Sequence, residues 1–408
     1  MEMAFAKYQN LEQKMLENLK INGIKHRSKA SGGLWLGSLI GFSAVLTLLK
    51  ESNSYSEICL VTGLAGFGLL VSCLCLYIRL CIGKSAIKDF QAIYFLPAII
   101  TSMLYLLIAN KGLLTSLIWG LSVGSLGTWG VVQLMSNCPG CFTIGEATIV
   151  THGNILFLLS VATNIPLRYH LPPIHNDDIV TVILQITLMI YWTICLLFCI
   201  FVITLQTLSG IQATTSIRKY FHVLAVLVYI PGLLFEPTLL YLGSGVIMGI
   251  FLLLELSRIL KISPLGDILQ KGFVIFVDEK DTLISLTPLY LLCGLSFPLW
   301  MPTSNVSLFV LLSGVLTVGI GDTAASFVGS KWGKHKWPGL EKSLEGTLGC
   351  VTSQLGTISV LVYMRYINDR WLLLRSIPSV IAISFIETKT DQIDNLVLPL
   401  LMYVCLII

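Results

Sequence analysis

Charged residues are scarce in this sequence: Asp, Glu, Lys and Arg together make up 12% of its 408 residues. A soluble globular domain carries about 25%. Hydrophobic residues reach 55%, and the mean hydropathy is +0.83. Such a chain has too little polar surface to face water on all sides. Its composition therefore argues against an ordinary soluble domain and predicts a protein that is solvated mostly by lipid.

Long apolar runs recur along the whole chain, and a bilayer core takes roughly 20 residues per helical crossing. Backbone groups in lipid must pair within their own segment, so these runs should be helices. We predict an all-α fold, a polytopic integral membrane protein with roughly ten to thirteen transmembrane helices. The runs that we assign are 34–49, 58–78, 92–109, 179–205, 241–256, 283–300, 308–320, 347–364 and 371–386.

Several other features are missing. The net charge of +4 is small for this length and indicates no nucleic-acid surface. No cleavable signal peptide is expected, because the first apolar run continues into the next spans. Cys138 and Cys141 form a Cys-Pro-Gly-Cys pair, but a zinc site needs four ligands and no second pair lies nearby. We find no internal repeat and no linker that would separate soluble domains, so any site must lie between helix ends.

The chain divides into three regions by composition. Residues 1–32 form a polar, basic N-terminal leader, which is either an amphipathic helix on the membrane or a disordered arm. Residues 33–283 form an N-terminal multispanning region. Residues 284–408 carry the densest polar chemistry and are assigned as the catalytic membrane region.

Acidic residues at the edges of spans are costly and are functional candidates by default. Four groups also have a structural interpretation. Glu146 could cap a helix, and Glu255 with Arg258 could form an internal ion pair. Asp278 could belong to a solvated loop. The basic residues Arg218, Lys219 and His222 could be ordinary positive-inside loop charges.

The segment "VGIGDTAASFVGSKWGKHKWPGLEKSLEGT" (318–347) is harder to explain structurally. Asp322 lies among small residues, which allow helices to approach closely. Glycines let backbone amides face an anion, lysines supply charge for phosphates, and Ser326 and Ser343 can donate hydrogen bonds. Asp322, with Asp391 or Asp394, offers oxygen ligands suited to Mg²⁺. Trp332 and Trp337 could stack on a base, although interfacial anchoring is the simpler interpretation.

This combination suggests a site for a metal nucleotide at a membrane border. A lysine-rich loop beside lipid is also the commonest kind of cytoplasmic loop. The sequence contains neither a Walker pattern nor the protein-kinase motifs, so those nucleotide-binding classes are excluded.

Three motifs resemble the polyprenol kinase family, and within it the dolichol kinases. They are "GDTAASFVGSKWGKHKWPG", "EKSLEGT" and "DQIDN" followed by Pro399, in that order, and upstream "FTIGEA" is also similar. The resemblance implies a multi-pass enzyme of the endoplasmic-reticulum membrane with its active site facing the cytosol. It implies transfer of the γ-phosphoryl group of CTP to dolichol, giving dolichyl phosphate for protein glycosylation.

The resemblance also implies roles for residues. The expected catalytic residues are Asp322, Lys342 and Glu345, with Glu345 orienting Lys342 or a metal-bound water. The expected Mg²⁺ ligands are Asp322, Asp391 and Asp394; Ca²⁺ or Mn²⁺ could replace Mg²⁺. The expected CTP-binding residues are Gly329, Ser330, Lys331, Gly333, Lys334, Lys336, Gly339, Lys342 and Ser343. Secondary candidates are Thr323, Ser326, Gly346, Asn395, Glu146, Arg218, Lys219 and Asp278.

The sequence departs from the family pattern at one position. Glu341 stands before Lys342 where the family often has a second basic residue, which leaves Lys342 as the better phosphate contact. Other CTP-dependent prenol kinases and phosphatidate cytidylyltransferase-like enzymes remain alternatives. A transporter is the alternative from a different class, although no matching halves are found. The partners expected are dolichol, membrane lipid and CTP, with no nucleic acid; a homo-oligomer is left open.

Overall fold

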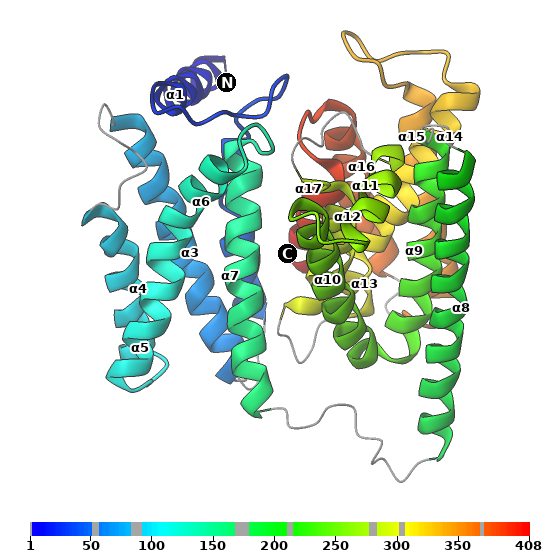
Figure 1. Cartoon of the computed structure of the whole chain (residues 1–408), viewed down its shortest axis with the longest axis horizontal. Coiled ribbons are helices and arrows are strands. Elements are labelled where there is room, and N and C mark those ends of the chain that lie inside the picture. Colours follow the sequence, from blue (N-terminus) through cyan, green and yellow to red (C-terminus); the bar gives the residue numbers. More distant parts are fainter. Residues whose placement is uncertain are drawn as a thin grey trace. The chain divides into compact units, whose positions relative to one another are not determined.

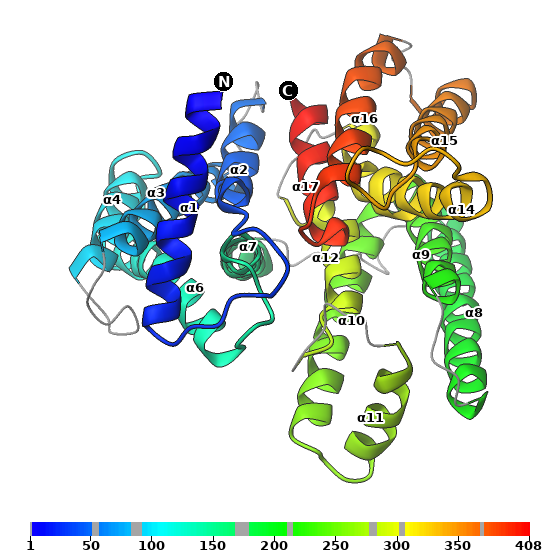
Figure 2. The same cartoon turned by 90° about the horizontal axis from the view of Figure 1, so that it is seen from above.

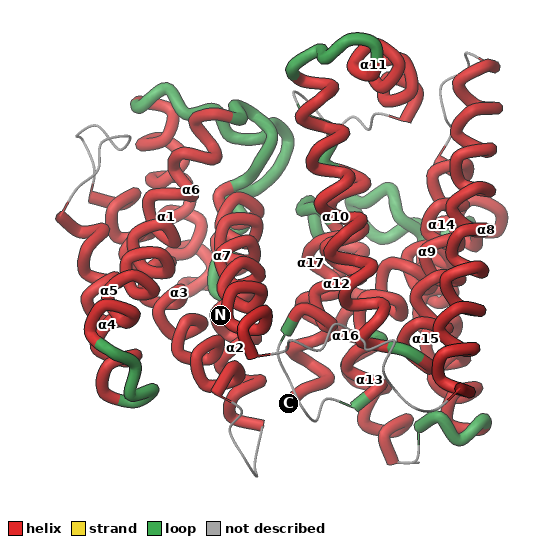
Figure 3. Tube along the Cα trace, turned by 60° about the horizontal axis from the view of Figure 1, so that its bottom comes forward, coloured by secondary structure: helices red, strands yellow, loops and turns green. Residues whose placement is uncertain are grey.

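A computed structural model describes residues 2–50, 57–82, 92–167, 179–209, 215–276, 284–301, 307–367 and 371–408. The regular elements in these ranges are helices, as predicted (Figure 3). One isolated antiparallel bridge, between Lys336 and Ser343, is the β pairing that the described part contains. The chain divides into two compact units between α7 and α8, so the boundary proposed at 283–284 falls inside the second unit.

The first unit is built from the elements α1 to α7 (Figure 1). They are α1 (Glu2–Ile21), η1 (Leu34–Leu36), α2 (Leu39–Lys50), α3 (Glu57–Ile82), η2 (Ala92–Tyr94), α4 (Phe95–Leu107), α5 (Leu113–Gly120), η3 (Leu121–Ser125), α6 (Leu126–Asn137) and α7 (Ile144–Leu167).

The second unit follows from α8 onward. Its elements are α8 (Ile179–Ser209), α9 (Thr215–Phe235), α10 (Pro237–Ile259), α11 (Leu265–Phe276), α12 (Thr287–Trp300), α13 (Leu308–Leu311), η4 (Val315–Asp322), α14 (Thr323–Trp332), α15 (Leu344–Tyr363), α16 (Trp371–Lys389) and α17 (Asp394–Ile407). Figure 2 shows α14, α15, α16 and α17 grouped within it.

Membrane-spanning helices are present among the described residues. Five are long and apolar enough to cross a bilayer: Glu57–Ile82, Leu113–Asn137, Ile144–Thr163, Ile179–Ser209 and Pro237–Ile259. Five shorter apolar helices accompany them. Many large apolar side chains on these helices are exposed, as expected where lipid takes the place of water. The chain is therefore an all-α, multi-pass membrane protein.

In the first unit, α3 is the central helix and contacts α1, α2, α4, α6 and α7. The leader residues Glu2–Ile21 form the helix α1, so the disordered alternative is wrong for this segment. Met15 and Leu19 on its apolar face are fully buried. Asn18 Nδ2 donates a hydrogen bond to the carbonyl oxygen of Leu80, 2.6 Å away, which fixes α1 against α3.

Glu146 has a structural role in the first unit. Its backbone amide donates to Thr143 Oγ1 at 3.2 Å, and its carboxylate accepts from the Thr143 amide at 3.0 Å, which is a capping box at the start of α7. Arg27 Nη2 donates to Glu146 Oε1 at 2.6 Å, and Glu146 is fully buried. The sequence allowed Glu146 to be either a functional residue or a helix cap, and the structure confirms that it caps α7.

In the second unit, η4 is the central segment and contacts α9, α12, α14, α15 and α16. It is a π-helical stretch between α13 and α14, and such wider turns are frequent at functional sites. Gly321 brings α15 close, since a Cβ there would lie 2.7 Å from Gln354 Nε2 and 3.0 Å from Cys350 Sγ. The predicted ion pair between Glu255 and Arg258 is confirmed on α10 at 2.7 Å.

Candidate active site

Asp322 ends the π-helical segment and is buried, with 6% of its surface exposed. The helix continues directly into α14, so its carboxylate does not cap the helix. Lys219 on α9 forms an ion pair with Asp322 Oδ2. Buried charges in a membrane protein are costly unless they are paired, and this pairing makes the buried carboxylate tolerable.

Two further carboxylates lie beside Asp322. One oxygen each from Asp322, Glu387 near the end of α16 and Asp394 at the start of α17 lie within 4.8 Å of one another. Oxygens bound to one Mg²⁺ at about 2.1 Å are roughly 3–4 Å apart, so a small contraction would bring the three into a shared coordination sphere. The donor set therefore fits a hard divalent cation such as Mg²⁺.

Lys342 is the second cation of this cluster. Its Nζ donates a 2.6 Å hydrogen bond to the Glu387 carbonyl oxygen and forms an ion pair with the Glu387 carboxylate. Burial disfavours the charged amine, but the nearby Glu387 and Asp394 outweigh it, so the pKa of Lys342 is raised above its ordinary value. Lys342 is therefore a cation at neutral pH. Among the described groups, Lys219 and Lys342 balance two of the three carboxylates.

Two polar side chains beside Asp322 lack hydrogen-bond partners. His222 Nδ1, one turn along α9 from Lys219, lies 3.5 Å from Asp322 Oδ2, which is too long for a well-formed hydrogen bond. His222 is buried, with 6% of its surface exposed. The hydroxyl of Thr323 is also buried and unpartnered. Unsatisfied buried groups are unusual in native proteins and are common where a ligand completes the hydrogen bonding.

Glycines of the predicted CTP-binding segment, with the secondary candidate Gly346, bring α14 against α15. A Cβ at Gly346 would lie 3.0 Å from the carbonyl oxygen of Ala325 and 3.4 Å from Gly329 Cα. A Cβ at Gly333 would lie 2.6 Å from Ser343 Oγ. Ser343 caps α15, since its Oγ accepts a 3.1 Å hydrogen bond from the Gly346 amide. These glycines therefore have a packing role that their spacing did not reveal.

The loop between α14 and α15 is a short hairpin. The Trp337 amide donates to the carbonyl oxygen of Lys342 at 3.0 Å, and the Leu340 amide donates to that of Trp337 at 3.0 Å. Gly339 has a φ of 72° at the turn, where a side chain would be strained. The side chains of Lys331, Lys334 and Lys336 are exposed around this hairpin. The loop thus presents cations to the solvent, while Lys342 points into the acidic cluster.

Glu345 supports the hairpin rather than Lys342. Both of its carboxylate oxygens accept from the His335 amide at 3.2 Å, and His335 Nδ1 lies 2.6 Å from Oε1. These hydrogen bonds, with that to His335 first, lower the pKa of Glu345 to about 2. Lys342 is held by Glu387 and not by Glu345, so that alternative for Glu345 is wrong. The other alternative, that Glu345 orients a metal-bound water, stays a prediction.

The structure places the remaining predicted residues as follows. Asp391 is exposed, accepts a 2.7 Å hydrogen bond from Gln392 Nε2 and is not part of the three-acid group; Glu387 lies in its place. Asn395 is buried beside Asp394, and its backbone carbonyl packs closely at Gly294 of α12. Ser330 Oγ donates to the Phe327 carbonyl oxygen at 3.0 Å, and Ser326 is half-buried on α14.

Both tryptophans of the loop have protein contacts. Trp337 Nε1 donates to Thr347 Oγ1 at 3.0 Å, and its ring packs edge-on against Phe385 at 5.4 Å. Trp332 is 59% exposed and packs edge-on against Phe327. The side chain of Arg218 and the whole of Asp278 lie outside the described residues.

Two residues of this cluster, Lys219 and Glu387, are difficult to recognise from the sequence alone. Lys219 is more simply explained by sequence as a loop charge, and Glu387, four residues before the "DQIDN" motif, is not among the expected site residues. The available signal was general: each is a charge within one or two turns of the border of an apolar run. Only the packing of α9, η4 and α16 shows that Lys219 pairs with Asp322 and that Glu387 pairs with Lys342.

Fold and site together define a class: a multi-pass helical membrane protein with a partly buried centre of three carboxylates and two lysines beside a basic loop. Comparison with known proteins narrows this class. A family model described as dolichol kinase matches residues 177–285. This match lies upstream of the motifs that indicated the resemblance.

Curated relatives give the same result. The chain is 38% identical to dolichol kinase from Homo sapiens over 206 residues, which cover 48% of this chain and 38% of that protein. It is 34% identical to dolichol kinase EVAN from Arabidopsis thaliana over 233 residues, covering 54% of this chain and 40% of that protein. Dolichol kinase sec59 from Schizosaccharomyces pombe is 28% identical over 237 residues, covering 54% and 46%.

The resemblance to dolichol kinases is therefore confirmed. The chain spans less than half the length of the curated relatives that it matches. No solved structure matches it.

Proposed function

We propose that this protein is a dolichol kinase that transfers the γ-phosphoryl group of CTP to the hydroxyl of dolichol. The observation that carries the proposal is the group of buried Asp322, buried Glu387 and half-buried Asp394, paired with Lys219 and Lys342, in a chain similar to dolichol kinases. The site lies where apolar helices meet a polar loop. That position suits a reaction between one substrate confined to lipid and another dissolved in water.

The reaction needs positioning and charge neutralisation more than covalent help from the protein. The dolichol hydroxyl oxygen would form a bond to the γ-phosphorus while the bond from that phosphorus to the bridging oxygen of CDP breaks. The hydroxyl proton would pass to a carboxylate of the cluster. Lys342 and Lys219 are placed to neutralise charge on the phosphoryl group, and the exposed lysines of the hairpin attract the triphosphate.

Asp322, Glu387 and Asp394 would hold a divalent cation, with Mg²⁺ the best fit to their hard oxygen donors and Ca²⁺ or Mn²⁺ the alternatives. Such an ion supplies positive charge against the phosphate oxygens. We further propose that the protein resides in the endoplasmic-reticulum membrane with the hairpin facing the cytosol. This orientation would expose the lysines to cytosolic nucleotide and deliver dolichyl phosphate for glycosylation.

The test uses the purified full chain in detergent with dolichol, Mg²⁺ and CTP labelled at the γ-phosphate, with labelled ATP in parallel. We expect label to move to the lipid from CTP and not from ATP. Asp322→Asn should abolish the transfer. Asp267→Asn removes an exposed acid on α11 of the same unit and should leave the transfer unchanged.

Each other outcome has a definite meaning. Transfer from ATP alone would overturn the assignment of CTP. No transfer to dolichol from either nucleotide would overturn the kinase proposal; phosphatidate and shorter prenols would then be tried. Flux of a solute across sealed vesicles without any CTP would favour the transporter.

A further inference from the structure

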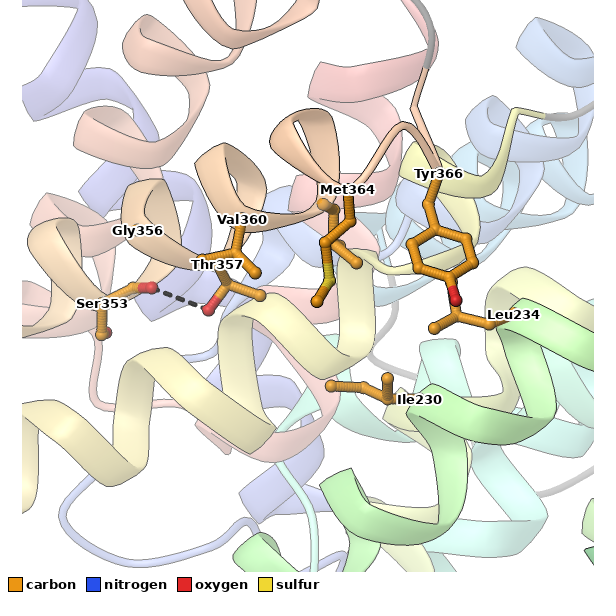
Figure 4. A pocket seen from close by; sticks show the side chains of 9 residues that line it. Ile230, Leu234, Ser353, Gly356, Thr357, Val360, Met364 and Tyr366 are labelled. Atoms are coloured by element: carbon orange, nitrogen blue, oxygen red, sulfur yellow. Dashed lines mark hydrogen bonds between the residues drawn. The ribbon is translucent and has the colours of Figure 1, made fainter.

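A groove opens between the second halves of α9 and α15 (Figure 4). Its volume is about 480 Å³. Figure 4 shows the side chains of Ile230 and Leu234 from α9 facing those of Val360, Met364 and Tyr366 from α15 and the turn after it. A groove of this size can hold a segment of a flexible hydrocarbon chain.

The walls of the groove are mostly apolar, and most of their polar groups already have hydrogen-bond partners. Three lining residues carry hydroxyl groups, and two of these hydroxyls are occupied within α15. Ser353 Oγ donates to the Cys350 carbonyl oxygen at 3.0 Å, and Thr357 Oγ1 donates to the Ser353 carbonyl oxygen at 2.9 Å. Neither hydroxyl therefore requires a partner from a ligand. The third hydroxyl belongs to Tyr366 at the far end, so the rest of the groove suits an apolar ligand.

Both helices of the groove begin at the proposed active site. Lys219, in the first turns of α9, pairs with Asp322, and eleven residues later Ile230 lines the groove, about 16 Å farther along the helix. Ser343 caps α15 next to Lys342, and Ser353 lines the groove about 15 Å along that helix. A chain with its head at Asp322 could therefore follow α9 and α15 into the groove.

The far end of the groove carries aromatic residues. Phe235 at the end of α9 packs edge-on against Tyr366, with ring centroids 6.4 Å apart. Tyr363 and Tyr366 are exposed at the same turn, and Trp371, the first residue of α16, is also exposed. Exposed Tyr and Trp side chains gather at the membrane–water interface, so the groove lies between that interface and the site border. This position would put the groove at the depth of lipid tails.

We propose that this groove holds the polyprenyl tail of the lipid alcohol while its hydroxyl lies at Asp322. The inference rests on the proposed kinase function and adds to it the place where the long substrate is recognised. Contacts in the groove contribute to binding but not to the chemical step. They therefore affect KM for the lipid and leave kcat unchanged.

Gly356 offers a way to fill the groove. It lines the wall on α15, and a Cβ there would meet no atom within 4 Å, so a larger side chain enters open space. Gly249 on α10 is a matched control, because it is also helical, also open at Cβ, and lies outside the groove. Gly356→Leu should therefore block the groove, and Gly249→Leu should not.

The experiment measures dolichol phosphorylation at varied dolichol concentration in mixed micelles. We expect Gly356→Leu to raise KM for dolichol about fivefold or more, with kcat and KM for CTP unchanged, because several methylene contacts are lost. Gly249→Leu should match the wild type in all three constants. If Gly356→Leu does not fold, Val360→Trp serves instead, since Val360 is 53% exposed on the rim.

An unchanged KM for dolichol in a folded variant with a filled groove overturns the inference. The groove would then bind the acyl chains of ordinary membrane lipids. A lower kcat at unchanged KM also overturns it, because the groove would then act on chemistry rather than binding. Absence of dolichol phosphorylation in the wild type is a separate result. It would overturn the proposed function, and with it the assignment of the groove to a prenyl tail.

Discussion

At the scale of single residues, the buried pair of Asp322 and Lys219 carries both stability and chemistry. Removing one partner of a buried ion pair leaves an uncompensated charge, which costs about 3–5 kcal/mol. We expect Lys219→Met to lower the free energy of unfolding by about that amount and to abolish turnover. Chemical denaturation in detergent and the CTP assay measure the two effects.

The double variant Lys219→Met with Asp322→Asn separates these two roles. It removes both charges, so most of the stability should return while turnover remains absent. A single Lys219→Met variant as stable as the wild type would contradict the pairing seen in the structure.

A second prediction at the scale of single residues concerns Lys342. Lys342→Ala should raise KM for CTP about tenfold or more, since charged hydrogen bonds are worth about 1.5–3 kcal/mol. Lys331→Ala, which removes an exposed lysine stacked on the Phe327 ring, should have a smaller effect. Equal effects of the two substitutions would argue against a special role for Lys342.

The pH dependence of Lys342 follows from its raised pKa. The charged amine of Lys342 contributes fully to stability below the ordinary pKa of lysine. That contribution is lost only as pH rises through the higher pKa of Lys342 in the folded protein. Deprotonation of Lys342 should therefore not limit activity anywhere near neutral pH.

At the scale of elements, Glu345 anchors the hairpin to the start of α15. Glu345→Ala should free the His335 amide, speed its hydrogen exchange and increase trypsin cleavage at the exposed Lys334 and Lys336. Glu341→Ala, at an exposed acid of the same loop, is the control and should change neither. Slow exchange in Glu345→Ala would show that the hairpin is held by other contacts.

The lowered pKa of Glu345 sets the pH range of this anchor. The ionised Glu345 carboxylate stabilises the folded hairpin fully above the ordinary carboxyl pKa of 4.5. This stabilisation is lost as pH falls through the lowered pKa of about 2 in the folded protein. Protection of the hairpin should thus persist from neutral pH down to about 5.

The contact between α14 and α15 gives another prediction for elements. Gly346→Ala places a methyl group 3.0 Å from the Ala325 carbonyl oxygen, so the helices must separate, at a cost of about 1–3 kcal/mol. Gly356→Ala on the same helix meets no atom within 4 Å and should be neutral or stabilising by about 0.5–1 kcal/mol. Thermal unfolding in detergent ranks the two variants, and the reverse order would contradict this packing.

At the scale of the whole molecule, the proposed chemistry lies in the second unit alone. Arg27 and Glu146 form a buried pair in the first unit, with side chains 7% and 0% exposed. Glu146→Gln should lower the free energy of unfolding by about 3 kcal/mol and leave kcat and KM of the folded fraction unchanged. Assays normalised to folded protein test this; a change in KM for CTP would place Glu146 in the function after all.

The sequence by itself determined the class of this protein. Low charge and long apolar runs indicate helices in lipid, because backbone N–H and C=O groups there must form hydrogen bonds within their own segment. It also singled out Asp322, Lys342 and Asp394 as candidates, since a charge at the border of a membrane span is costly. The structure brings these three side chains together, and their roles stay predictions. The ion pair of Glu255 with Arg258 followed from helical spacing alone.

Only the tertiary structure decided which charges meet. Lys219 comes from a helix about a hundred residues before Asp322, and no local pattern fixes how α9 packs on η4. Glu387 and Asp391 are separated by four positions, yet α16 buries the first beside Lys342 and leaves the second exposed. Gly329, Gly333 and Gly346 likewise allow close packing of α14 on α15. Pairing across helices depends on packing geometry, which one sequence does not contain.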